Sequence, residues 1–363
     1  METSKGLHGN IARGLAGEVT HVRHSDNLVA PGADSRFREG KKRVLVTGGA
    51  GYIGSHTVHE LLSAGYEVTV FDDLSRGHPE QIEGVPLVIG DTCDREALED
   101  VLAGGFDAVV HFASESLVGE SVRNPDKYFR RNVVGGLTLL SAMVKAGVKK
   151  MVFSSSAAVY GDPESVPIPE TAPMRPMSPY GETKAFIENA LRWYDRAYGL
   201  RSISLRYFNA AGAHPSGRMG EDHDPETHLI PLAIGAVLSG KPITVFGDDY
   251  PTPDGTCIRD YIHVMDLASA HVLALDALWS GAETCSLNLG TGQGYSVMDV
   301  IRCIVEITGR KVPYEVGPRR PGDPAVLVAA SGRAKEVLGW APVHSSLKEI
   351  IETAWRWHSR SRL

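Results

Sequence analysis

Cysteine is scarce in this 363-residue chain: the four residues Cys93, Cys257, Cys285 and Cys303 are far apart and none form a CxxC pair. This scarcity excludes a small disulfide-stapled scaffold and is typical of reduced thiols in the cytosol. We therefore expect a cytoplasmic protein.

An excess of basic residues is also absent. Lys and Arg number 37 against 44 Asp and Glu, which gives a net charge of −7. Without a basic face, the chain is not expected to take nucleic acid as its main partner. No uninterrupted apolar stretch approaches the length of a membrane span, so no membrane association is expected. The 42% hydrophobic residues and the chain length are enough for a sizeable core, which excludes disorder.

The first 40 residues differ in composition from the rest. They carry five basic and five acidic side chains, and they lack both the apolar segment of a signal peptide and the acid-poor signature of a transit peptide. We expect a flexible leader over residues 1–40, whose purpose the sequence leaves open. Two further parts are predicted: a cofactor-binding domain over 41–208 and a smaller ligand-binding lobe over 209–363, with some later segments returning to the first domain.

From residue 41 onward, short apolar runs alternate with helical patterns. Runs typical of strands occur at 42–47, 67–72, 86–89, 108–112, 150–154 and 202–207, and helical spacing occurs at 53–64, 96–102, 128–145 and 183–198. Strands rich in Val and Ile that alternate with helices predict a parallel sheet covered on both faces. The predicted class is α/β, a Rossmann-type doubly wound parallel sheet with a smaller mixed α/β C-terminal lobe. Helices are also expected at 297–307 and 347–357.

A glycine-rich turn joins the first predicted strand to the first helix. Gly48, Gly51 and Gly54 satisfy the spacing that lets backbone approach a pyrophosphate at a helix N-terminus. Asp72 ends the next strand, where a carboxylate can bind an adenosine ribose and would repel a 2′-phosphate. This favours NAD over NADP, although a carboxylate at a strand end is also an ordinary turn residue. Asp91 is a plausible contact on the adenine side.

A second constellation carries reactive groups. Tyr180 and Lys184 stand four residues apart on a predicted helix, so both lie on one of its faces. A nearby ammonium favours the ionised form of a phenol, which makes this pair a candidate general base. Ser156 ends the fifth strand, at the edge where open parallel sheets bind ligands. We expect the neighbouring Ser154 and Ser155 only to cap backbone groups.

These motifs, together with HFASESLVGES at 111–121, RYFNAAGAHPSGRMGED at 206–222 and GTCIRDYIHVMDLA at 255–268, resemble the extended short-chain dehydrogenase/reductase family. Within it, the chain is most similar to the UDP-glucose 4-epimerases. The resemblance covers about residues 43–357, and the motifs after Asn209 are its most specific part.

The resemblance implies an NAD-dependent isomerase of UDP-galactose and UDP-glucose that works as a homodimer. The implied catalytic residues are Ser156, Tyr180 and Lys184, with no metal. The implied cofactor-binding residues are Gly48, Gly51, Tyr52, Ile53, Gly54, Asp72, Asp91, Phe112, Ala113, Asn132, Tyr180, Lys184 and Phe208. The implied UDP-sugar-binding residues are Ser156, Asn209, His228, Leu229, Arg259, Arg320 and Asp323.

Three alternatives stay open at this stage. An epimerase of UDP-N-acetylhexosamines or UDP-pentoses would share all these motifs, and the intermediate bulk of Leu327 does not decide between substrates. Nucleotide-sugar 4,6-dehydratases resemble one another in having an Asp-Glu pair just after the fifth strand. This chain has Ala157 and Ala158 at that place. Neither alanine can transfer a proton. A non-catalytic NAD sensor would not need Ser156, Tyr180 and Lys184 together.

Overall fold

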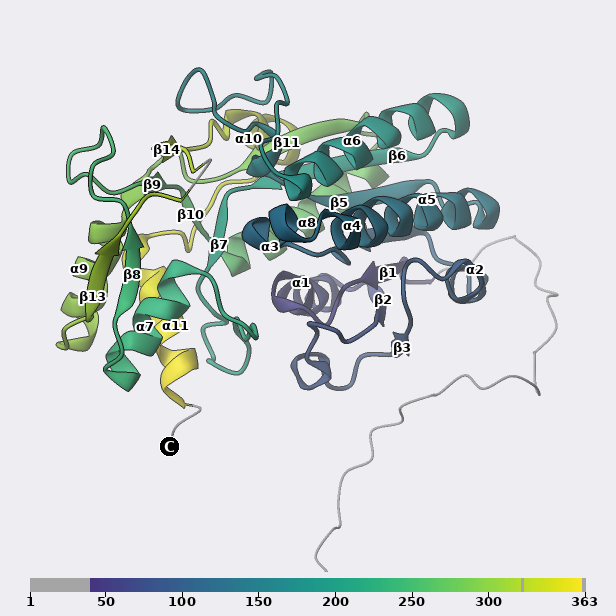
Figure 1. The fold of residues 1–363 in the computed structure, drawn as a ribbon. Coiled ribbons are helices and arrows are strands. Elements are labelled where there is room, and N and C mark those ends of the chain that lie inside the picture. The colour runs from purple at the N-terminus through teal and green to yellow at the C-terminus, as the bar shows by residue number, and fades with distance from the viewer. Residues whose placement is uncertain (1–39, 321–322, 361–363) are drawn as a thin grey trace, which may run out of the picture.

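A parallel sheet of seven strands forms the centre of the molecule (Figure 1). The computed structural model describes residues 40–320 and 323–360, so the expected leader lies almost entirely outside the described residues. In spatial order the strands are β11 (Cys285–Leu289), β6 (Arg201–Tyr207), β5 (Lys150–Ser156), β4 (Ala108–His111), β1 (Arg43–Thr47), β2 (Glu67–Asp72) and β3 (Leu87–Ile89). All their pairings are parallel.

Helices cover both faces of this sheet. Val44 and Val46 of β1 pack into one apolar core with α1 (Tyr52–Ser63), α8 (Val264–Trp279) and α10 (Gly332–Leu338). Leu45 points to the opposite face, where the core includes α2 (Arg95–Leu102), α5 (Gly135–Ala146) and α6 (Pro179–Tyr198). Burial on both faces explains why the strands are nearly continuous apolar runs. The predicted doubly wound α/β class is confirmed.

A smaller lobe follows β6 and is built from short strands and helices. It has three small sheets, which pair β10 (Tyr261–His263) with β7 (Asn209–Ala211), β9 (Ile258–Arg259) with both β12 (Tyr295–Ser296) and β14 (Val326–Leu327), and β8 (Ile243–Phe246) with β13 (Tyr314–Gly317). Its core lies among α7 (Leu229–Ser239), α9 (Val297–Thr308) and α11 (Leu347–Arg360). The exact division at residue 209 stays a prediction, because β11 and α8 lie later in the chain yet belong to the layers of the main sheet.

A nearly continuous helical stretch leads from β4 toward β5. It comprises α3 (Val118–Arg123), α4 (Pro125–Tyr128), a π-helical segment η2 (Phe129–Val134) and α5. Two short 3-10 helices, η1 (Pro79–Ile82) and η3 (Ala157–Val159), follow β2 and β5. Within the described ranges, no helix combines the length and the apolar character needed to cross a bilayer.

The strand order reverses direction between β1 and β4, which leaves a crevice at their carboxyl ends. The loops that follow these two strands approach each other very closely. A Cβ atom added at Gly48 would lie 2.4 Å from the backbone nitrogen of Ala113, and Gly48 has a positive φ of 72°. Glycine is therefore required at the point where the two loops meet.

Candidate active site

Helix α6 carries Tyr180 and Lys184 to the carboxyl edge of the sheet. The helix begins at Pro179, four residues before the predicted start, because Ser178 caps it by accepting a hydrogen bond from Gly181 N at 3.2 Å. Proline at the first helical position suits this start, since its missing N–H is not needed there. Tyr180 therefore lies in the first turn, and Lys184 follows one turn later on the same face.

The phenol of Tyr180 is buried near the Ser156 side chain. Burial raises the pKa of Tyr180, and the Ser156 side chain opposes this increase. Ser156 ends β5, and its Oγ also accepts a hydrogen bond from Ala158 N at 3.2 Å. The structure thus brings Tyr180 and Ser156, two of the three expected reactive side chains, close enough together for Ser156 to affect the pKa of Tyr180.

Lys184 is buried, with 2% of its surface exposed. Its Nζ donates hydrogen bonds to Ser114 Oγ and to the carbonyl oxygen of Ser154, both at 2.8 Å. Burial lowers the pKa of Lys184 to about 7, although the charge of Glu188 opposes the shift. Ser114 was missed from the sequence, yet it follows β4 by three residues and lies at the same sheet edge as the other site residues.

Ser154 and Ser155 do not cap backbone groups, so that expectation was wrong. The Ser154 hydroxyl contacts the hydroxyl of Tyr207, and the Ser155 hydroxyl donates to Glu188 Oε1 at 2.5 Å. Both side chains are buried between β5 and its neighbours, where a hydroxyl needs a hydrogen-bond partner within the protein.

Glu188 extends the reactive face of α6 by one further turn and forms a buried ion pair. Arg206 Nε lies 2.9 Å from Glu188 Oε1, and both side chains are almost fully buried. Ser286 on β11 donates to Glu188 Oε2 at 2.9 Å. This pair therefore connects α6 to β5, β6 and β11, and it fixes the helix that presents Tyr180 and Lys184.

The glycine-rich turn has the geometry that a dinucleotide needs. Gly48 and Gly51 form the turn, and a Cβ added at Gly54 would lie 2.2 Å from the carbonyl oxygen of Gly48. The turn thus packs directly against the first turn of α1, whose N-terminal N–H groups favour a phosphate. Ile53 packs on the apolar core, and the Tyr52 hydroxyl donates to Gly212 O at 2.6 Å.

Asp72 lies beside this turn at the end of β2. Its Oδ2 accepts a hydrogen bond from Ala50 N at 3.0 Å, and its Oδ1 accepts one from Leu74 N at 2.9 Å. Burial raises the pKa of this carboxyl, and the two backbone donors oppose the shift. A carboxylate held in this way beside the pyrophosphate turn fits the ribose of NAD.

The other residues expected around the cofactor differ in what they contact. Asp91 lies 2.6 Å from the guanidinium of Arg131, and Phe112 packs its ring 4.7 Å from that of His271. Phe208 packs against the apolar cluster that contains Ala157. Ala113 lies against Gly48, as described above.

Asn132 has its amide fully engaged within the protein. Its Oδ1 accepts from Glu115 N at 2.8 Å, and its Nδ2 donates to Glu115 O and to Thr183 Oγ1, both at 3.0 Å. These bonds connect η2 to the loop after β4 and to α6. The arrangement suits a residue that positions this loop beside the cofactor crevice.

The expected UDP-binding residues gather in the second lobe. Arg259 forms an ion pair with Asp323, and the Arg320 guanidinium lies 4.0 Å from the centre of the Phe246 ring. The charges of all three residues act on the half-buried thiol of Cys257, whose pKa is raised mainly by burial. They therefore form one cluster, in which the two arginines supply positive charge suited to phosphate oxygens.

Strand pairings connect this cluster to the reactive residues. Arg259 of β9 is paired with Leu327 of β14, and Leu327 packs against the apolar cluster with Phe208 and Ala157. Asn209 begins β7, and its N–H donates to Asp260 O at 3.0 Å.

His228 and Leu229 mark the start of α7. The His228 side chain turns toward Glu221, and their closest atoms are 2.5 Å apart. Burial would lower the pKa of His228, but Glu221 and Glu226 raise it to about 10. The imidazole thus interacts with acidic neighbours, which the sequence alone did not indicate.

Comparisons with known proteins agree with this geometry. Residues 44–290 match the NAD dependent epimerase/dehydratase family. The chain is 51% identical to the UDP-glucose 4-epimerase of Halalkalibacterium halodurans over 87% of its own length and 95% of that protein.

Solved structures give the same result. The UDP-glucose 4-epimerase of Brucella ovis in complex with NAD is 48% identical, with a TM-score of 0.85 over 86% of this chain and 97% of that one. The enzyme of Stenotrophomonas maltophila, solved with NAD and formylated UDP-arabinopyranose, is 42% identical, with a TM-score of 0.85 over 88% and 99%. The chain therefore belongs to the NAD-dependent epimerase/dehydratase family and, within it, to the UDP-glucose 4-epimerases.

Proposed function

We propose that this chain interconverts UDP-galactose and UDP-glucose by oxidising C4 of the hexose and reducing it again from the opposite side. The observation that carries the proposal is the placement of the buried Lys184 Nζ atom 5.7 Å from the centre of the Tyr180 ring, with Ser156 near the phenol and with the glycine turn and Asp72 at the same sheet edge. A phenol, a hydroxyl and an ammonium at the crevice of a doubly wound sheet suit proton transfer at a carbinol.

Bound NAD supplies the hydride acceptor for C4 and then the hydride donor. The residues that would hold it are Gly48, Gly51, Gly54 and Asp72, with Tyr52, Ile53, Asp91, Phe112, Ala113, Asn132 and Phe208 around them. The carboxylate of Asp72 disfavours a 2′-phosphate, which supports NAD over NADP.

Tyr180 would remove the proton from the 4-hydroxyl group of the sugar and later return it. Because Tyr180 is buried, its phenolate needs a nearby positive charge, and protonated Lys184 supplies one on the same helix face. Ser156, which lies near the Tyr180 phenol, would bind the 4-oxygen of the sugar and align it with the base.

Epimerisation requires that the nucleotide stays bound while the sugar turns. Arg259, Arg320 and Asp323 would anchor the UDP part, with Asn209 and the start of α7 at His228 and Leu229 near the diphosphate. The 4-keto sugar can then rotate about its diphosphate link and present its other face. In contrast to a 4,6-dehydratase, Ala157 and Ala158 offer no group for eliminating water.

We also propose a cytoplasmic homodimer. Helices α3 to α6 adjoin one another, and several large apolar side chains on them are exposed. These are Val118, Val122, Phe129, Val134, Phe186 and Trp193. Exposed apolar residues on neighbouring helices suit an interface between two copies of the chain.

A single experiment tests the proposed activity. Purified protein is given UDP-galactose deuterated at C4, without added NAD, and the products are identified by mass spectrometry and NMR. We expect UDP-glucose that retains deuterium at C4. Loss of the label to solvent, or a requirement for added NAD with transfer of label to the free pool, would overturn the mechanism. Parallel reactions with UDP-N-acetylhexosamines and UDP-pentoses determine which other UDP-sugars the enzyme accepts.

A further inference from the structure

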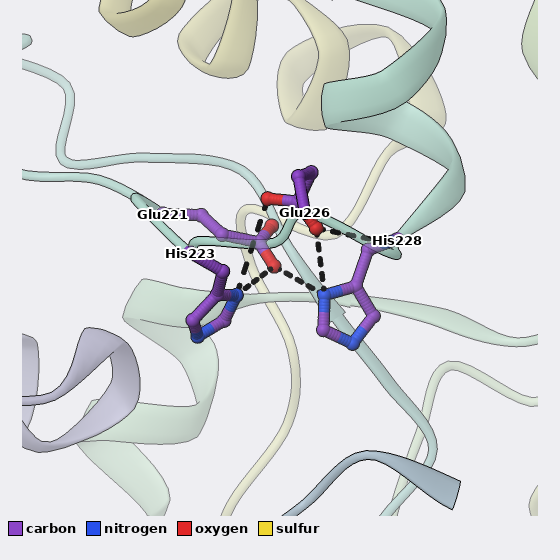
Figure 2. A group of neighbouring side chains, drawn as sticks. All are labelled: Glu221, His223, Glu226 and His228. Atoms are coloured by element: carbon purple, nitrogen blue, oxygen red, sulfur yellow. Dashed lines mark hydrogen bonds and ion pairs between the residues drawn. The ribbon is translucent and has the colours of Figure 1, made fainter. Parts of the chain in front are cut away.

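The loop between β7 and α7 brings two glutamates and two histidines together (Figure 2). Glu221, His223, Glu226 and His228 come from one stretch of eight residues, and each offers one ligand atom. These four atoms all lie within 4.8 Å of one another. Apart from His228, which was expected near the diphosphate, the proposed reaction uses no side chain of this cluster.

Each of the two imidazoles points its Nδ1 atom into the cluster (Figure 2). His223 Nδ1 lies 3.0 Å and His228 Nδ1 lies 2.5 Å from a single oxygen, Oε1 of Glu221. Glu226 completes the set, at 3.3 Å from His228 Nδ1 and 4.0 Å from His223 Nδ1. Ligand atoms on a tetrahedral Zn²⁺ ion are about 3.3 Å apart, since each bond is about 2.0 to 2.1 Å long. The observed separations lie on either side of this value.

The cluster also contains polar atoms whose requirements the protein does not meet by itself. His228 Nδ1 is buried and has no hydrogen-bond partner, because its short contact with Glu221 lacks hydrogen-bond geometry. Glu221 has 3% of its side chain exposed, and its only ionic partners among the described residues are the two histidines. A buried carboxylate requires cationic compensation, which a protonated histidine provides when no metal is bound. A divalent cation would replace that proton, compensate the carboxylate and accept both nitrogen lone pairs.

The surrounding structure orients the ligands. Oε1 of Glu226 accepts hydrogen bonds from Thr227 N at 2.6 Å and His228 N at 2.8 Å. This fixes the glutamate and leaves its other oxygen facing His223. Such outer contacts hold metal ligands in a defined geometry.

Both halves of the molecule hold the loop in place. Trp357 Nε1 on α11 donates to the carbonyl oxygen of Glu221 at 2.8 Å. From the other side, His78 Nε2 lies 2.7 Å from the carbonyl oxygen of Asp222. His78 follows β2, the strand that ends at Asp72. The cluster therefore lies where the cofactor-binding part meets the second lobe.

We propose that Glu221, His223, Glu226 and His228 bind one divalent transition-metal ion, with Zn²⁺ as the ion that two imidazoles and two carboxylates fit best. Imidazole ligands favour transition metals over Mg²⁺ and Ca²⁺, which prefer oxygen-only sites. Four protein ligands complete a tetrahedral shell and leave no position for water or substrate, as in structural zinc sites. The ion takes no part in chemistry at C4.

The metal has a definite structural role in this position. It orders the loop that precedes α7 and thereby fixes where Leu229 and the start of this helix lie. The side chain of His228 then serves the metal, so only its backbone faces the substrate. This assignment departs from the sequence-based expectation that the chain has no metal, and it does not depend on which sugar is epimerised.

Metal content and a cobalt spectrum test the proposal directly on the full chain, with any affinity tag removed. We expect about one equivalent of zinc per chain, or saturable binding of one Zn²⁺ by calorimetry after treatment with a chelator. Replacement by Co²⁺ should give the intense visible absorption of a tetrahedral centre. A chain that takes up no Zn²⁺ in calorimetry, or a Co²⁺ spectrum typical of six-coordination, would overturn the proposal.

Variants locate the site. His223→Gln and Glu221→Gln should each weaken Zn²⁺ binding at least about 100-fold and abolish the increase in unfolding temperature that Zn²⁺ gives the wild type. The matched control is His344→Gln, because His344 Nδ1 lies 2.7 Å from Glu349 in an isolated pair elsewhere in the chain. Equal Zn²⁺ affinity in wild type and His223→Gln would contradict the assignment. Circular dichroism establishes that each variant folds.

Hydrogen exchange examines the structural role separately. Zn²⁺ should slow amide exchange in residues 221–229 of the wild type, and this effect should be lost in His223→Gln. An ion that binds without changing exchange in this loop would rule out the ordering role.

Discussion

Lys184 Nζ lies 5.7 Å from the centre of the Tyr180 ring, one turn further along α6. The same nitrogen donates hydrogen bonds to Ser114 Oγ and to the carbonyl oxygen of Ser154, so two hydrogen bonds fix its position. A cation at this distance from a buried phenol influences the phenol's ionisation without forming a direct hydrogen bond to it.

Replacing the phenol tests this relationship first. Tyr180→Phe should reduce kcat for UDP-galactose by at least about a thousandfold, because general base catalysis contributes about 10²- to 10⁴-fold. NAD content and the unfolding temperature should change little. Tyr198→Phe, at the exposed end of the same helix, is the control and should keep full activity. Turnover within tenfold of wild type in Tyr180→Phe would exclude this residue as the base.

The lowered pKa of Lys184 predicts how stability depends on pH. In protein stripped of nucleotide, the folded chain releases this proton near pH 7, whereas an unfolded Lys has a pKa of about 10.4. Between these values the unfolded state binds more protons, so wild-type stability rises with pH relative to Lys184→Met.

The free energy of unfolding of Lys184→Met should therefore exceed that of the wild type by most below pH 7, and this difference should become smaller toward pH 10. Urea unfolding at several pH values measures the difference. Lys145→Met, at an exposed lysine that pairs with Glu99, should show no such trend. A difference between wild type and Lys184→Met that stays constant with pH would show that the buried amine has an ordinary pKa.

Asp72 predicts cofactor choice. Asp72→Asn removes the negative charge beside the ribose site, so affinity for NAD should fall about tenfold or more and discrimination against NADP should weaken. Fluorescence titration of nucleotide-free protein with both cofactors measures the ratio. Glu67→Gln, at the exposed start of the same strand, should leave the ratio unchanged. An unaltered preference in Asp72→Asn would mean that other groups select the cofactor.

The buried pair of Glu188 and Arg206 predicts a large effect on stability. Arg206→Met leaves a buried carboxylate without its counter-charge, which should cost about 3 to 5 kcal/mol in the free energy of unfolding. Arg175→Met is the matched control, because Arg175 and Glu164 form an exposed pair at 2.8 Å that contributes little. Chemical denaturation measures the free energy of unfolding of both variants. A similarly small decrease in both would indicate that water solvates the charge of Glu188.

Close packing of the glycine turn predicts that a larger residue at Gly54 prevents NAD binding. Gly54→Ala would place a methyl group 2.2 Å from the carbonyl oxygen of Gly48, so the turn must shift and bound NAD should be lost. Gly235→Ala on α7 meets no atom within 4 Å and should retain NAD. Absorbance of the cofactor released on denaturation distinguishes the two. Full NAD content in Gly54→Ala would refute the tight approach.

The sequence predicted the main sheet well because its strands are local apolar runs. Residues 67–72, for example, coincide with β2 as observed. The expected range of α6 began at Thr183, which is four residues too late. Ser178 and Pro179 are recognisable start signals that would have given the observed start. Tyr180 and Lys184 could be paired from the sequence because their spacing follows the helix period, and Ser156 joined them because it ends a strand at the same sheet edge.

The second lobe was harder to predict from sequence. Its strands, such as β9 and β14, have only two residues each, and their pairing depends on partners far along the chain. Glu188 and Arg206 were missed for the same reason, since a buried ion pair leaves no periodic signature. Of the four residues in the Glu and His cluster, only His228 had a role expected from the sequence, near the substrate diphosphate. Only the folded backbone brings the four ligand atoms together.

The position of β11 at the edge of the main sheet has a consequence for how the protein is made. β11 pairs with β6, and its Leu287 and Leu289 are fully buried, although nearly eighty residues separate the two strands. During synthesis the nascent sheet cannot be completed until residue 289 has left the ribosome. A fragment ending near residue 208 would present β6 as a bare hydrogen-bonding edge, so truncation there should yield insoluble material.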